Sequence, residues 1–146
     1  MNNFIYAINK SFEEMKKVVN TILNKSKYEE EERQKLFFCI GTCIHWILDY
    51  AERIEINESD KQYISAFRYI NNSLKHAFEV KEISAYSGGI TYPIEFPLEI
   101  PEKQIVWSVA DNGKSSQRNN YKEILSGKNV VVTCENAIEI LMRYQI

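Results

Sequence analysis

The positions of the prolines constrain the fold of this chain more than any other feature. All three prolines lie between positions 93 and 101, and none interrupts residues 1–92. A proline inside a helix removes a backbone hydrogen bond and clashes with the preceding turn. Its absence before position 93 therefore permits long uninterrupted helices, and its clustering sets one extended segment apart.

Apolar residues recur every three or four positions in four segments, as expected of helices with one face in a core. We predict helices over residues 3–23, 30–54, 59–79 and 130–144. The short connections between the first three favour antiparallel neighbours. The predicted fold class is mainly α, a four-helix up-and-down bundle. Six residues of these stripes are predicted to share its core: Phe12, Ile40, Ile47, Phe67, Leu74 and Leu141.

Residues 84–128, between the third and fourth helices, lack the helical period. Alternation of apolar and polar residues predicts a strand over 90–95 that pairs with a second strand over 104–109. Residues 84–89 and 111–120 are typical of loops, and 121–125 of a short turn. Trp107 is expected to seal the second strand against the bundle. The prediction is a single domain, residues 1–146, with a small β-hairpin inserted.

Charge and cysteine content limit the classes of function. The formal net charge of −2 gives no overall positive field for a nucleic-acid backbone, although a local patch remains compatible with RNA. No signal peptide and no run of about 18 apolar residues is present, so no membrane association is expected. Cys39, Cys43 and Cys134 lie in apolar helical settings, which is typical of reduced thiols in a cytoplasmic protein. His45 points away from the first two cysteines, so we predict no metal site and no cofactor.

A polar stripe on the third predicted helix carries the candidate chemistry. Arg68, Asn72 and His76 are spaced i, i+4 and i+8, so they share one face, flanked by Asn71 and Lys75. A guanidinium, an amide and an imidazole in a row have the chemistry to bind a phosphodiester and to transfer a proton near neutral pH. The solvated side of an amphipathic helix carries the same residue types, so the spacing leaves both interpretations open.

A four-helix bundle with Arg…Asn…Lys-His on its third helix resembles the HEPN superfamily, the higher eukaryotes and prokaryotes nucleotide-binding domains. In active members an arginine and a following histidine form a metal-independent RNA-cleaving site, usually where two copies meet. The resemblance implies catalytic roles for Arg68 and His76, with Asn71, Asn72 and Lys75 in binding. Seven residues separate Arg68 from His76, a wider spacing than the family's usual one.

Two functions remain open at this stage. Many members of the superfamily belong to toxin–antitoxin and phage-defence systems, so one function is an accessory or binding module of such a prokaryotic system. The other is a dimeric metal-independent ribonuclease that uses Arg68 and His76. The resemblance implies a homodimer, with RNA or a partner protein as ligand. The wide spacing and the mild acidity favour the module.

The second predicted helix has a side that its main apolar stripe does not use. Phe38 lies on this side together with His45, Asp49 and Glu52. An exposed large apolar residue is found at partner surfaces, although single ones are also common on monomers.

Overall fold

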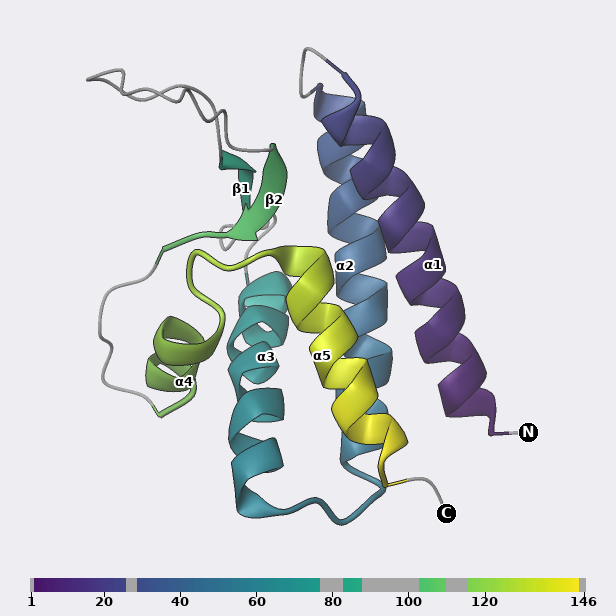
Figure 1. The fold of residues 1–146 in the computed structure, drawn as a ribbon, viewed down its shortest axis with the longest axis vertical. Coiled ribbons are helices and arrows are strands. Elements are labelled where there is room, and N and C mark those ends of the chain that lie inside the picture. The colour runs from purple at the N-terminus through teal and green to yellow at the C-terminus, as the bar shows by residue number, and fades with distance from the viewer. Residues whose placement is uncertain (1, 26–28, 77–82, 88–102, 110–115, 145–146) are drawn as a thin grey trace, which may run out of the picture.

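The computed structural model describes residues 2–25, 29–76, 83–87, 103–109 and 116–144. In this part of the chain the protein is mainly helical, as the sequence predicts (Figure 1). Two short strands accompany the helices. The elements in chain order are α1 (Asn3–Leu23), α2 (Glu30–Ala51), α3 (Glu58–His76), β1 (Ile83–Ser87), β2 (Gln104–Trp107), α4 (Ser116–Ile124) and α5 (Val130–Met142).

Side-chain caps account for where three of the helices begin. The Asn2 side chain accepts a hydrogen bond from the Phe4 backbone N–H at 2.8 Å, at the start of α1. Asn57 does the same before α3, and Asn129 before α5. These bonds satisfy backbone donors that have no partner inside the helix. The bounds of α1 match the prediction, whereas α2 ends at Ala51 rather than at residue 54.

The four long helices share one core, with α2 at its centre. Figure 1 shows α1 and α2 side by side, with successive long helices running in alternating directions. α2 contacts α1, α3 and α5. Of the six predicted core residues, Leu74 is only partly buried and packs against the others. The five that are buried are Phe12, Ile40, Ile47, Phe67 and Leu141.

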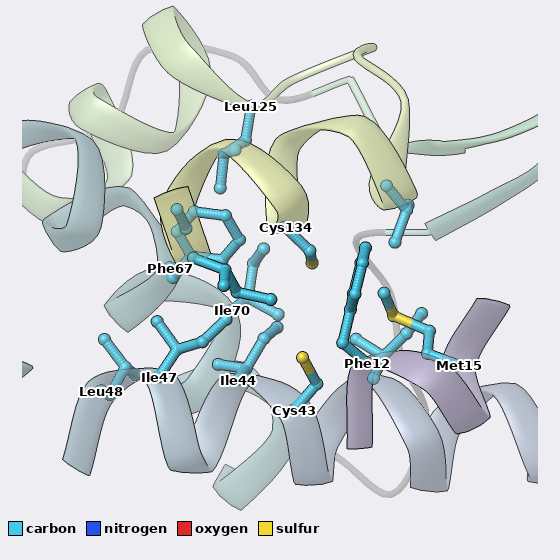
Figure 2. Packing of buried hydrophobic residues seen from close by; sticks show 14 of the residues in the cluster. Phe12, Met15, Cys43, Ile44, Ile47, Leu48, Phe67, Ile70, Leu125 and Cys134 are labelled. Carbon is cyan, nitrogen blue, oxygen red and sulfur yellow. The ribbon is translucent and has the colours of Figure 1, made fainter. Parts of the chain in front are cut away.

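The middle of the core holds two cysteines that face one another from α2 and α5 (Figure 2). The thiols of Cys43 and Cys134 are hydrogen-bonded, and both residues are fully buried. This hydrogen bond, together with burial, raises the pKa of the Cys134 thiol. Cys39 is also buried, and all three cysteines are free, as the sequence predicts.

The strand pairing differs from the prediction. β1 runs antiparallel to β2, with Ile83 opposite Trp107 and Ser84 opposite Val106. The loop that the sequence predicts over residues 84–89 is wrong for 84–87, which belong to β1. Serine and alanine have weak strand propensity, so the pairing depends on the tertiary setting and not on a local pattern. The predicted strand over 90–95 lies outside the described residues.

Trp107 seals the strand pair against the bundle, as predicted. Its side chain is fully buried, and its Nε1–H donates a hydrogen bond to Thr133 Oγ1 of α5 at 2.8 Å. Its ring meets that of Phe67 edge-on, with centroids 6.3 Å apart. The Trp107 carbonyl accepts a hydrogen bond from the Gly127 N–H at 2.9 Å. β2 is thereby joined to the turn that leads into α5.

α4 is a helix where the sequence predicted a polar loop and a turn. Its residues are mostly polar, so no apolar stripe identifies it. The helix is held instead by packing against α3. Tyr121 is fully buried, with its ring centroid 4.9 Å from that of Tyr69, and Asn120 donates a hydrogen bond to Ser65. Short helices of this kind are stable only through such tertiary contacts.

Truncation in the core tests the packing. Ile47→Ala removes a fully buried side chain from α2 and should lower the free energy of unfolding by about 2–5 kcal/mol. Val132→Ala on α5, where the side chain is half-exposed, should change it by less than about 0.5 kcal/mol. Urea unfolding monitored by circular dichroism measures both values. Equal destabilisation by the two substitutions would contradict the described core.

The thiols supply a second test. The intact mass measured without reductant should equal that of a chain with three reduced cysteines. A thiol reagent should label the native protein slowly, because the cysteines are buried, and should label all three after denaturation. A mass lower by the hydrogens lost to a disulfide would contradict this expectation.

Candidate functional site

A polar pocket lies where α2, α3 and α4 meet. Its volume is about 240 Å³. Two carboxylates, a guanidinium, an imidazole and three side-chain amides contribute to its wall. The lining residues are His45, Leu48, Asp49, Glu52, Arg68, Asn71, Asn72 and Gln117.

The pocket contains three of the five residues that the sequence singled out. Arg68, Asn71 and Asn72 all lie in its wall. The predicted stripe on α3 thus faces a hollow between helices, at least along these residues. The side chains of Lys75 and His76 lie outside the described residues.

Arg68 is engaged by the carboxylate of Glu52, the residue that directly follows α2. Its Nη1 lies 3.0 Å from Glu52 Oε1, a distance at which the guanidinium donates a hydrogen bond. The two side chains are 35% and 59% exposed, so water screens the pair. The bond nevertheless gives the positive charge of Arg68 a negative neighbour within the pocket.

Asn72 connects α3 to α4. Its Nδ2–H donates a hydrogen bond to Gln117 Oε1 at 2.8 Å. Gln117 lies in the first turns of α4, so this amide pair helps to close the pocket on its α4 side. The sequence did not indicate Gln117 as a site residue, because α4 itself was not predicted.

His45 and Asp49 form the α2 side of the pocket, one helical turn apart. His45 is exposed, and its ring meets that of Trp46 edge-on at 5.2 Å. The Asp49 side chain is 33% exposed, and its Oδ2 lies 3.8 Å from Nη2 of Arg53. Arg53 also lies over the ring of Phe4, 4.6 Å from the centroid, on the side of α2 toward α1.

The sequence contained a partial signal for this α2 side. His45, Asp49 and Glu52 share the side of the helix that carries Phe38, and Phe38 proves to be 69% exposed. From the sequence this grouping is compatible with a partner surface, and no pattern connects it to the stripe on α3. Only the packing of α2 against α3 brings the two stripes together.

Charge decides what kind of ligand the pocket suits. Asp49 and Glu52 are the two carboxylates of the lining; Arg68, within the lining, pairs with Glu52, and Arg53, outside it, pairs with Asp49. A phosphodiester would have to compete with these carboxylates for the guanidinium groups, whereas a cationic group finds acceptors in them. The amides of Asn71 and Gln117 offer both donors and acceptors to a polar group.

The described part of the chain has neither a metal-binding cluster nor a membrane-spanning helix. No group of three or more His, Cys, Asp or Glu side chains there is arranged to hold a metal ion. Cys39 and Cys43 point into the core, whereas His45 is exposed. Among the described helices, none combines the length and apolar character that crossing a bilayer requires.

Comparison of the chain with protein-family models, with curated proteins and with solved structures finds no match in any of the three. The function is therefore proposed from the geometry of the pocket and from the resemblance of the α3 sequence.

A double-mutant cycle tests whether Arg68 and Glu52 serve stability. Arg68→Gln, Glu52→Gln and the double variant should give a coupling energy below about 1 kcal/mol, because the pair is largely exposed. Lys35 and Glu31, an exposed pair on the same helix, provide the matched control cycle. Urea unfolding measures all variants. A coupling above about 2 kcal/mol would mean that the pair is structural.

Proposed function

We propose that this chain is a HEPN-like helical-bundle protein that acts as an accessory or binding module of a prokaryotic defence or toxin–antitoxin system. In this proposal α1, α2, α3 and α5 are the four helices of the bundle, and the strands with α4 form its insertion. The partner binds at the α2–α3–α4 pocket. Asn71 and Asn72 take part in binding, and Lys75 continues the same stripe by its spacing.

The ion pair between Arg68 and Glu52 is the observation that carries this proposal. A ribonuclease of the kind implied by the resemblance uses its arginine to hold a phosphate. Here Glu52 Oε1 lies 3.0 Å from the guanidinium, and Asp49 adds a second negative charge to the pocket wall. A phosphodiester would have to displace Glu52 from the guanidinium of Arg68 and would then lie beside both carboxylates. The same arrangement supports the binding module.

The bond between Asn72 and Gln117 supports the same conclusion. A functional stripe that is free to engage RNA should present unpaired side chains, whereas a structural or partner-binding stripe is tied to neighbouring helices. Arg68 is bonded to α2 and Asn72 to α4. Two of the three residues of the i, i+4, i+8 stripe are thus engaged within the chain.

RNA cleavage without added metal tests the proposal against the ribonuclease that uses Arg68 and His76. The folded wild type should leave a single-stranded RNA intact, because the arginine is paired. The chain has two histidines, which provide matched variants, His76→Ala and His45→Ala. Circular dichroism confirms that each variant is folded, and gel analysis of labelled RNA measures cleavage.

Cleavage by the wild type that His76→Ala lowers by about 10²–10⁴-fold, and His45→Ala does not, would reject the module and establish the Arg68–His76 nuclease. Light scattering on the same samples measures oligomeric state, for which the resemblance predicts a homodimer.

A further inference from the structure

We propose that the α2–α3–α4 pocket receives an arginine side chain of a partner protein, with Phe38, further along α2, as a second and apolar contact. This inference rests on the proposed binding module and specifies the chemistry of its partner.

The carboxylate of Asp49 is the first reason to expect a cationic group. Its side chain lies in the pocket wall and is two-thirds removed from water, yet the ion pair it makes with Arg53 spans 3.8 Å. That distance is too long for a hydrogen bond. The carboxylate of Asp49 therefore has acceptor capacity for a donor that enters the pocket.

The acceptors around Asp49 suit a guanidinium better than an ammonium group. A guanidinium is planar and carries five N–H donors in a fixed fork, which matches carboxylate oxygens in pairs. Glu52 directly follows α2, three residues after Asp49. A carboxylate accepts several hydrogen bonds, so Glu52 retains acceptor capacity beside its bond from Arg68. The side-chain oxygen of Asn71 is a further acceptor in the wall.

The size of the pocket points to a single side chain. Its volume of about 240 Å³ is below the roughly 300–1,000 Å³ of pockets that enclose drug-sized ligands. An arginine side chain that enters from outside fits a hollow of this size and leaves the rest of its protein on the surface. The planar ring of His45, which is exposed at the pocket, offers a face for stacking of the guanidinium.

Phe38 indicates that the arginine belongs to a protein rather than to a small molecule. Its side chain is 69% exposed, on the same side of α2 as His45 and Asp49. Phe38 and Asp49 are eleven positions apart, which at 1.5 Å per residue places the two about 16 Å apart along the helix. Aromatic and arginine contacts dominate protein interfaces, and an extended peptide spans this distance with about five residues.

A peptide titration tests the inference. The probe is a blocked peptide with an arginine and, five positions later, a leucine, separated by serine and glycine. The matched probe replaces the arginine by citrulline, which has nearly the same shape and no charge. NMR spectra of the ¹⁵N-labelled chain should show that the arginine peptide shifts the amide signals of Asp49, Asn72 and Gln117. The citrulline peptide should bind about tenfold more weakly, as expected for the loss of a charge-assisted hydrogen bond.

Two substitutions locate the contacts. Asp49→Asn should weaken the arginine peptide by about tenfold, whereas Glu139→Gln, which removes an exposed carboxylate from α5, should not. Phe38→Ala should weaken the peptide but leave the binding of agmatine unchanged, because agmatine offers only the guanidinium. Val132→Ala is the control for removing an exposed apolar side chain.

Each alternative has its own outcome. Equal binding of the arginine and citrulline peptides, or no shift of the pocket signals by either, would overturn the inference. Agmatine that binds as tightly as the peptide would assign the pocket to a small guanidino compound. A dimer that Asp49→Asn dissociates in the absence of peptide would assign it to an arginine of a second copy.

The failure of the inference is distinguishable from that of the proposed function. A single-stranded RNA that shifts the pocket signals where the arginine peptide does not would overturn the arginine partner and leave a binding module. Cleavage of that RNA would reject the module itself.

Discussion

Burial of α2 on three sides is the constraint on which the rest of the structure depends. α1, α3 and α5 each contact this helix, and Ile40, Ile44 and Ile47 along it are completely buried. Apolar contact on this scale is the dominant favourable contribution to folding. It leaves one narrow side of α2 for polar residues, and that side borders α3. The pocket is the place where this remaining side meets the polar stripe of α3.

The long helices were predictable because each contains its own signal. The stripe of α1 and the capping Asn2 determine its start and its period within a single segment. α4 and β1 were not predictable for the opposite reason. Ser116–Ile124 has no apolar period, and its stability depends on Tyr121 packing against Tyr69, which belongs to a distant segment. β1 likewise depends on β2, which Trp107 holds against α5.

The candidate site was predictable only on one helix. The spacing of Arg68 and Asn72 identified a polar stripe on α3, and both residues do line the pocket. The wall opposite them could not be assigned, because its residues are brought together by tertiary packing. Among these residues, Glu52 bears most on the proposed function. Its carboxylate pairs with Arg68, the arginine that a nuclease of the expected kind would use. A sequence pattern indicates which side chains share one face of a helix. It does not indicate which charged residue of a distant segment lies opposite that face.

The contact between α1 and α5 has a consequence for folding during synthesis of the chain. Cys134, Ala137 and Leu141 of α5 are fully buried in the core that α1, α2 and α3 begin. After α2 has been synthesised, residues 52–129 must follow before α5 is made. At about 5–20 residues per second this takes several seconds. Throughout that interval, the apolar faces of the helices already synthesised are not covered by α5. Synthesis of α5 therefore ends the period in which the core of α1, α2 and α3 is incomplete and prone to aggregate.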